Sequence, residues 1–337
     1  MGFLRKSLTF DFGSANTVVC ENGQIVFDET TLISVWPEGY IEVGQDARRL
    51  RDGEKVGFWG QWPAGECNKT FYPISNGYVG DFYAFDSYVK GVLKKLTWLP
   101  RLCSVRIAIP DDLSCDEGDM CTRVFYDPFY VKGIKDIKFI HQSVAASIGL
   151  NLSAKKYHLI VDIGYGKTQV SLVKDLRVVK TKLWRNVSGC SWISDIKDYL
   201  KFQHHLKCGQ ITAEWLLISV AAANEDINDI PNARSVTGPS VMTAHPVTVT
   251  LDHKELAKVL NPNLQLFEKE LDVFIQEDIM TISEDVRKDI VSEGLWLIGG
   301  GSRLRGLSER LKNNLNLSIH TTDNPFHVIA RGAECKI

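Results

Sequence analysis

Several marks of secreted, membrane-spanning and nucleic-acid-binding proteins are missing from this chain of 337 residues. Its eight cysteines form no CxxC pair and no regular framework, which is typical of reduced thiols rather than disulfides. No apolar run approaches the length of a membrane-spanning helix, and the N-terminus has no signal-peptide core. We therefore expect a soluble, cytoplasmic protein.

An excess of charge of one sign is missing as well. Lys and Arg total 39 against 41 Asp and Glu, so no strong overall field attracts nucleic acid, and we expect no nucleic-acid partner. The hydrophobic share of 44% is that of an ordinary globular protein, and the length allows two domains with separate cores.

One cluster resembles a metal site, but it is incomplete. It consists of His204, His205 and Cys208, without a second pair of ligands nearby. We interpret it as the polar end of a helix, and zinc binding is the alternative.

Three glycine-containing turns follow apolar strands. The first, Asp11-Phe-Gly-Ser-Ala-Asn-Thr17, ends a strand at residues 7–12, and strands at residues 18–21 and 24–27 flank the hairpin signal Asn22-Gly23. Its tip would offer backbone N–H and hydroxyl donors to phosphate oxygens, and Asp11 can hold a hydrated magnesium ion. The tip residues are Gly13, Ser14, Ala15, Asn16 and Thr17.

The second turn repeats the first. An apolar strand at residues 156–162 ends in Asp162-Ile-Gly-Tyr-Gly-Lys-Thr168, and residues 170–173 return as a strand. The two aspartate-glycine hairpins indicate an internal duplication in which each half grips phosphate from its own side, and hence a cleft between two domains. The residues assigned to phosphate binding here are Gly164, Tyr165, Gly166 and Lys167.

The third turn has three consecutive glycines after the strand that contains Trp296. Glycines let the backbone approach something flat or anionic, and residues 304–315 have the apolar spacing of a helix whose N-terminus would face that ligand. A strand, a glycine turn and a helix form the geometry of a nucleotide site. The turn consists of Gly299, Gly300, Gly301, Ser302 and Arg303.

Two further side chains are candidates for the same site. Gln142, at the start of a small-residue helix at residues 141–149, is a candidate for positioning a water against a γ-phosphate, and a helix-terminus hydrogen bond is the alternative. Glu214, in a helix expected at residues 210–223, can accept hydrogen bonds from a ribose.

The remaining chain alternates strands and helices, with breaks expected at Pro128 and Pro262 and a hairpin tip at Thr237-Gly-Pro239. Residues 51–73 are irregular and rich in aromatics. We expect these aromatics to fold into a small subdomain, and an interface is the alternative. They are Trp59, Trp62, Phe71 and Tyr72.

The motifs DFGSANT, DIGYGKT and GGGSRLRG, in this order, resemble the two phosphate motifs and the adenosine motif of the actin, sugar-kinase and heat-shock-chaperone superfamily. Within it, the chain looks most like the bacterial actins of the MreB and Mbl type, over essentially its whole length. The segments that carry this resemblance are DFGSANTVV with NGQIVFDE, VGQDARRL, PISNGYVGDF, QSVAASIGL, ITAE, RSVTGPS and NPFHVIARGA.

The resemblance implies an α/β, actin-like fold of two duplicated βββαβα domains with a nucleotide cleft between them and small inserted subdomains. Domain I would span residues 1–140, with an insertion around 30–75, and domain II residues 141–322, with an insertion around 209–252. Residues 323–337 would form a C-terminal helix that returns to domain I.

The resemblance also implies the cofactors and their ligands. ATP and Mg2+ would bind, with phosphate contacts from residues 14–16 and 164–166, ribose at Glu214, and adenine and sugar at residues 300–303. Asp11 and Asp162 would hold magnesium through water. Gln142 falls where the family has its catalytic glutamate and where eukaryotic actin has a glutamine.

The second turn departs from the family pattern. It has Tyr165 for a glycine, Lys167 for a threonine and Gln169 for a glutamate, and Leu217 replaces a lysine expected beside the adenosine. Lys167 could neutralise phosphate charge directly, whereas the Tyr165 ring must point away from the phosphates or obstruct them. We therefore expect slow or absent hydrolysis.

The leading hypothesis is a bacterial actin that assembles with itself into protofilaments, with a slow ATPase coupled to polymerisation. The second is a nucleotide-binding scaffold that co-assembles with another bacterial actin without efficient hydrolysis. The third, a small-molecule kinase or a chaperone, lacks an identifiable acidic base or a substrate domain in this sequence.

Peripheral contact with the inner membrane surface is predicted from Phe3 and Leu4 beside Arg5, and from the loop with Trp59 and Trp62. Deleting residues 2–7 and replacing both tryptophans should lower co-sedimentation with anionic liposomes. Co-sedimentation that stays unchanged would contradict this prediction.

Overall fold

The computed structural model describes residues 6–35, 41–51, 69–97, 100–116, 118–243 and 245–334. Residues 1–5 and the Trp59 and Trp62 loop, on which the membrane prediction rests, lie outside the described residues. The chain folds into two compact units. One consists of Met1–Ser153, Leu176–Val178 and Phe326–Ile337, and the other of Ala154–Asp175 and Val179–Pro325.

The first unit is built on a five-stranded sheet in the order β10-β9-β1-β2-β3. β1 runs antiparallel to β2 and parallel to β9. The turn between β2 and β3 is Asn22-Gly23, with both residues at positive φ, which confirms the predicted hairpin. The strands are β1 Lys6–Phe12, β2 Asn16–Glu21, β3 Gln24–Thr30, β9 Cys103–Ile109 and β10 Asp136–His141.

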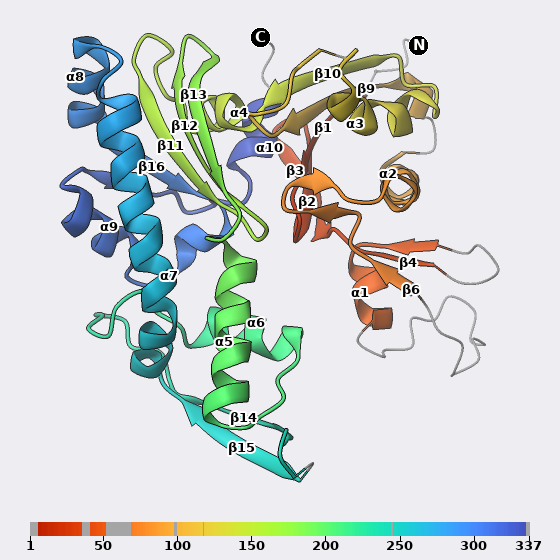
Figure 1. Ribbon diagram of the computed structural model, residues 1–337. Coiled ribbons are helices and arrows are strands. Elements are labelled where there is room, and N and C mark those ends of the chain that lie inside the picture. Colours follow the sequence, from red (N-terminus) through yellow and green to blue (C-terminus); the bar gives the residue numbers. More distant parts are fainter. Residues whose placement is uncertain are drawn as a thin grey trace. The chain divides into compact units, whose positions relative to one another are not determined.

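Alternation along β1 separates two layers of helices. Leu8, Phe10 and Phe12 belong to a core shared with α2 and α3, whereas Thr9 and Asp11 point to the other face of the sheet. On that other face α4 and α10 pack against each other and against the sheet (Figure 1). Asp11 therefore lies on the same face as α4. These helices are α2 Phe82–Leu96, α3 Met120–Tyr130, α4 Gln142–Gly149 and α10 Val328–Ala333.

Small elements are inserted between β3 and α2. A three-stranded sheet has the order β5-β4-β6, and a short hairpin, β7 with β8, follows it. Phe71 and Tyr72 are exposed, so the prediction that the aromatics of this stretch fold inward is wrong for these two. The inserted elements are β4 Ile33–Val35, β5 Ile41–Val43, α1 Gln45–Arg51, β6 Lys69–Phe71, β7 Ile74–Ser75 and β8 Tyr78–Val79.

The second unit repeats the sheet of the first. β11 runs antiparallel to β12 and parallel to β16, in the order β13-β12-β11-β16-β17. Written from its other end, as β17-β16-β11-β12-β13, this order corresponds strand by strand to β10-β9-β1-β2-β3. The parallel neighbour β16 takes the place of β9 and the antiparallel neighbour β12 that of β2, which confirms the predicted duplication. The strands are β11 His158–Ile163, β12 Thr168–Lys174, β13 Arg177–Trp184, β16 Leu295–Ile298 and β17 Ile319–His320.

The core of the second unit lies between the sheet and a layer of helices that contains α5 and α7. α7 is the long helix in Figure 1. Trp192 and Phe267, both fully buried, fill it together with Val161 of β11. Ser188 and Asp252 cap the two helices through their side chains. The helical segments are α5 Gly189–Gln203, α6 Gln210–Ser219, α7 His253–Val273, a π-helical turn Phe274–Ile279, α8 Glu284–Glu293, a 3-10 turn η3 Gly300–Arg303 and α9 Leu307–Leu315.

Three predictions about local breaks are wrong. α3 contains Pro128 and α7 runs through Pro262 without a break. Pro262 has no N–H to donate to the carbonyl of Lys258, four residues earlier. Both residues are exposed, so this carbonyl can bond to water. Thr237-Gly-Pro239 lies inside β14 (Arg234–Pro239), which pairs with β15 (Pro246–Leu251), so the connection of this hairpin begins only after Pro239.

No helix in the described ranges is long and apolar enough to cross a bilayer.

A titratable group in α5 sets a pH dependence of stability. Burial, and then the charge of Asp198, raise the pKa of Asp195 from 3.8 to about 6. The folded protein thus binds the Asp195 proton more tightly than the unfolded chain does. Protonated Asp195 therefore adds to the free energy of unfolding at low pH, and this contribution is lost as the pH rises through about 6.

Replacing Asp195 by Asn should therefore raise the free energy of unfolding by about 1 kcal/mol at about pH 8, and should give no gain at about pH 4. Urea unfolding at both pH values measures the difference, and Asp226→Asn, at an exposed aspartate of the same unit, is the matched control. An equal gain at both pH values would show that the charge of Asp195 is not the cause.

Candidate functional site

The first candidate phosphate turn is closed by its own backbone. The N–H of Gly13 donates to the carbonyl of Asn16 at 3.0 Å. The turn directly follows β1, which places Asp11 near the carboxyl end of that strand. Within the described part of the chain, the N–H groups of Ser14 and Ala15 have no backbone acceptor. The turn can therefore donate both N–H groups to an anion.

Side chains around this turn hold it in place. Ser14 Oγ accepts the N–H of Gly77 at 2.9 Å, which leaves the Ser14 hydroxyl proton for another acceptor. Thr17, fully buried, shares its hydroxyl with Thr31 at 2.9 Å, and Thr31 in turn donates to the Gly13 carbonyl at 2.7 Å. The Thr17 hydroxyl thus supports the turn from behind, and its contact with phosphate stays a prediction.

Gln142 and Asp11 meet at the carboxyl ends of the parallel strands. Gln142 Nε2 donates to Asp11 Oδ1 at 3.2 Å, and the Gln142 side chain is buried. The amide oxygen of Gln142 is an acceptor that can orient a water, as the candidate role requires. The structure thus brings the candidate catalytic and magnesium-holding residues of the first unit into direct contact.

Two residues of this region escaped the sequence analysis. Asp111, buried just beyond β9, accepts the N–H of Ser143 at 3.1 Å and so caps α4, whose own N-cap His141 makes no side-chain cap. Gly77 lies in a turn with Asn76, and both have positive φ. The Asn-Gly dipeptide is a signal visible in the sequence, whereas an aspartate after a strand says little by itself.

The second candidate turn has the same closure. The N–H of Gly164 donates to the carbonyl of Lys167 at 2.9 Å, as Gly13 does to Asn16. The start of α5 binds this turn from outside, because Gly189 and Cys190 donate their N–H groups to the carbonyls of Gly164 and Tyr165. Asp162 lies near the carboxyl end of β11, as Asp11 does in β1.

The bulky residues of the second turn have partners within their unit. The Tyr165 hydroxyl accepts Nε2 of Gln210 at 2.8 Å, and its ring packs against the core, so the ring is anchored toward α6. Lys167 is buried and donates through Nζ to Gln169 Oε1 at 3.0 Å. Two of the residues that depart from the family pattern are thus bonded to each other.

The glycines of the third turn approach the protein itself. A Cβ added to Gly299, whose φ is +78°, would lie 2.2 Å from Asp162 Oδ1, and one added to Gly301 would lie 2.2 Å from Ile163 Cγ2. The expectation that a ligand requires these glycines is therefore too narrow, since β11 already requires two of them. Ser302 donates its hydroxyl to the Gly299 carbonyl at 2.7 Å, and Arg303 is exposed.

The helix of Glu214 is fixed at both ends. Gln210, the first residue of α6, bonds to Tyr165, and the carbonyl of Ile218 accepts Arg305 Nη1 at 3.1 Å just beyond η3. α6 thus connects the second turn to the segment after the third turn. Glu214 is partly exposed, and among the residues that the structure describes no hydrogen bond or ion pair joins it to either turn.

His204 ends α5 as its C-cap, which confirms the interpretation of the His-Cys cluster as a polar helix end. Its Nε2 lies 3.1 Å from Glu255 Oε1. Among the described residues, no group of three or more His, Cys, Asp or Glu side chains is placed to hold a metal ion directly.

Comparison with known proteins gives consistent matches over nearly the whole chain. The family model described as MreB/Mbl protein matches residues 5–337. The cell shape-determining protein Mbl of Bacillus subtilis (strain 168) is 23% identical, over 97% of this chain and 94% of Mbl. The crystal structure of MreB 5 of Spiroplasma citri bound to AMPPNP has a TM-score of 0.84 at 19% identity, over 98% of this chain and 96% of that chain. A MamK double helical filament has a TM-score of 0.74 at 15% identity and covers 98% of both chains. The structural likenesses show an actin-like fold.

Replacing Gly299 by Ala should lower the free energy of unfolding by about 3 kcal/mol, because the new Cβ meets the Asp162 carboxylate and φ is positive. Gly23→Ala is the matched control, since its φ is +77° but nothing lies within 4 Å of the added atom, and it should cost about 1 kcal/mol. Thermal unfolding measures both, and equal losses would show that backbone strain alone decides.

Proposed function

The chain belongs to the MreB/Mbl family of bacterial actins, and from this premise we propose that it binds ATP and assembles into filaments. Two relatives support the proposal by what they bind or form. MreB5 of Spiroplasma citri has been solved with AMPPNP and with ADP, and MamK forms a double helical filament.

The observation that carries nucleotide binding is the repeated turn. Gly13 and Gly164 close their turns by the same hydrogen bond to the residue three positions on. The N–H groups of Ser14, Ala15 and Gly166 have no backbone acceptor within the described residues, and a phosphate oxygen would supply one. In this proposal both units contribute N–H donors to the phosphates.

The acidic residues fit a hydrated magnesium ion rather than a directly bound metal. Asp11 and Asp162 each stand at the end of a strand, partly exposed, and Mg2+ usually keeps several waters and takes one or two carboxylates beside the phosphates. When bound, the ion would neutralise phosphate charge. Asp11 and Asp162 would orient its waters, and the Gln142 amide fixes the Asp11 carboxylate for this task.

The remaining site residues complete the proposal. Glu214 of α6 would accept hydrogen bonds from the ribose, and the backbone of Gly300 to Arg303 would contact adenine and sugar. Gln142 would orient the attacking water through its amide oxygen. An amide cannot take up the proton of that water, so hydrolysis coupled to polymerisation would be slow.

The proposed cellular role is that of a cytoplasmic, self-assembling filament that supports cell shape or organises an internal structure. The curated relatives Mbl and MreB carry the name cell shape-determining protein. Peripheral contact with the inner membrane surface and co-assembly with another bacterial actin belong to the same proposal.

One observation favours the alternative of a scaffold without efficient hydrolysis. Lys167 is buried and bonded to Gln169, where the family resemblance leads us to expect threonine and glutamate. A fixed ammonium group beside phosphate would hold nucleotide tightly, whereas a neutral Gln169 cannot act as a base. Such a site would bind ATP and retain it.

Electron microscopy of purified protein with ATP and Mg2+ should show filaments that are missing without nucleotide. Asp162→Ala should weaken Mg-ATP binding about 10- to 100-fold, because it removes a carboxylate that orients the waters of the ion. Asp226→Ala, at an exposed aspartate of the same unit, should leave binding unchanged. Calorimetric titration of both variants against Mg-ATP measures the effect.

Phosphate release from assembled protein separates the two hypotheses. Release that Asp162→Ala abolishes identifies the ATPase, whereas filaments without release identify the scaffold. If wild-type protein neither binds ATP nor forms filaments, the proposal is wrong.

A further inference from the structure

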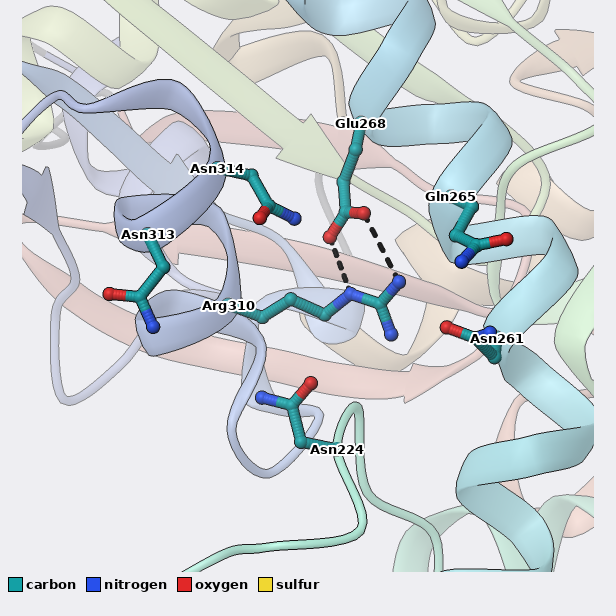
Figure 2. A pocket seen from close by; sticks show the side chains of 7 residues that line it. All are labelled: Asn224, Asn261, Gln265, Glu268, Arg310, Asn313 and Asn314. Carbon is teal, nitrogen blue, oxygen red and sulfur yellow. Dashed lines mark hydrogen bonds and ion pairs between the residues drawn. The ribbon is translucent and has the colours of Figure 1, made fainter.

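A polar hollow of about 310 Å³ lies on the second unit, and none of its lining residues belongs to the three glycine turns. Figure 2 shows that its walls come from α7, from α9 and from the loop after α6. We call it the carboxamide pocket. It is lined by Asn224, Asn261, Gln265, Glu268, Arg310, Asn313 and Asn314.

Helical spacing gathers these side chains. Asn261, Gln265 and Glu268 follow one another at intervals of four and three residues and so share one face of α7. Arg310 and Asn314 stand four residues apart on α9. The core-facing residues of α7 lie on the neighbouring face of the helix, so the polar face runs along the border between core and surface, with Glu268 buried and Gln265 exposed.

An ion pair forms the floor of the pocket. Arg310 and Glu268 are each more than nine-tenths buried, and the guanidinium binds the carboxylate through two N–H groups, the longer at 3.1 Å from Nη2 to Oε2. Arg310 Nη1 also donates to the Ala223 carbonyl at 2.7 Å. In Figure 2 the Arg310 side chain crosses from α9 toward α7 between Glu268 and Asn224. The opposite charges cancel, so the floor favours neither an anion nor a cation.

The walls of the pocket consist of carboxamides. Within the described residues, the side chains of Asn261, Gln265, Asn313 and Asn314 make no hydrogen bond, and Asn224 reaches only the Gly306 carbonyl, at 3.4 Å. A carboxamide offers N–H donors and a carbonyl acceptor side by side, which is the pattern that a peptide group or another carboxamide complements. Among the lining residues there is no aromatic ring on which a sugar or a base could stack.

We propose that the carboxamide pocket binds an uncharged segment of a partner polypeptide, one that presents backbone amides together with Asn or Gln side chains. The neutral floor gives no electrostatic attraction to acidic or basic segments, and the carboxamide walls pair with the amide groups. The proposed binding requires neither ATP nor a filament, so the inference can fail without the proposed function failing.

The test is a titration of the full chain with acetyl-Gln-Asn-Gln-Asn-amide, followed by nuclear magnetic resonance of the side-chain NH2 groups. At about 10 mM peptide, a site with a Kd near 1 mM is mostly filled, and the signals of Asn261 and Gln265 should shift. The double variant Asn261→Ala, Gln265→Ala should bind about tenfold more weakly, because two paired amide contacts are lost.

Gln276→Ala is the matched control, because Gln276 belongs to the turn that follows α7, bonds to Asp272 and does not line the pocket. It should leave the titration unchanged. Missing shifts at the pocket, or equal shifts with acetyl-Glu-Asp-Glu-Asp-amide, would overturn the proposal. Equal shifts with maltose would assign the pocket to a polyhydroxylated ligand instead.

Discussion

The structure of both candidate phosphate turns depends on one hydrogen bond, from a glycine N–H to the carbonyl three residues later. It closes the turn at 3.0 Å in the first unit and at 2.9 Å in the second. Within the described residues, the N–H groups of Ser14, Ala15 and Gly166, inside these closed turns, have no backbone acceptor. Asp11 and Asp162 precede the closing glycine by two residues in each hairpin, so the closure places both carboxylates at equivalent positions.

The second turn keeps this geometry although two of its residues are large. Tyr165 extends its hydroxyl to Gln210 at the start of α6, and Lys167 turns back to Gln169 on β12. Both side chains therefore have a partner within their own unit. The second turn therefore keeps the backbone closure of the first turn with these side chains in place. Tyr165 also ties the turn to α6, which Arg305 holds at its other end.

Much of the fold could be predicted from the sequence, because its signals are local. Asn22-Gly23 marks a hairpin through the positive φ of both residues, and the repeat of aspartate and glycine after two apolar strands marks the duplication. Glycines that serve distant contacts could not be read in this way. At position 238 in β14, a Cβ would lie 2.9 Å from the Lys207 carbonyl oxygen, and at position 299 a Cβ would clash with the Asp162 carboxylate, so both positions need glycine. Sequence shows the missing side chain but not the neighbour that requires its absence.

The pair of Gln142 and Asp11 connects the local geometry to the expected rate of hydrolysis. The Gln142 amide donates a hydrogen bond through Nε2 to Asp11 Oδ1 at 3.2 Å, which an ionised glutamate in its place could not do. Two carboxylates at that distance would repel each other, and one of them would hold a proton. With glutamine, the side-chain amide orients the Asp11 carboxylate and brings no second negative charge beside it. The same amide has no site for the proton of an attacking water, so an arrangement that favours holding a hydrated cation disfavours rapid turnover.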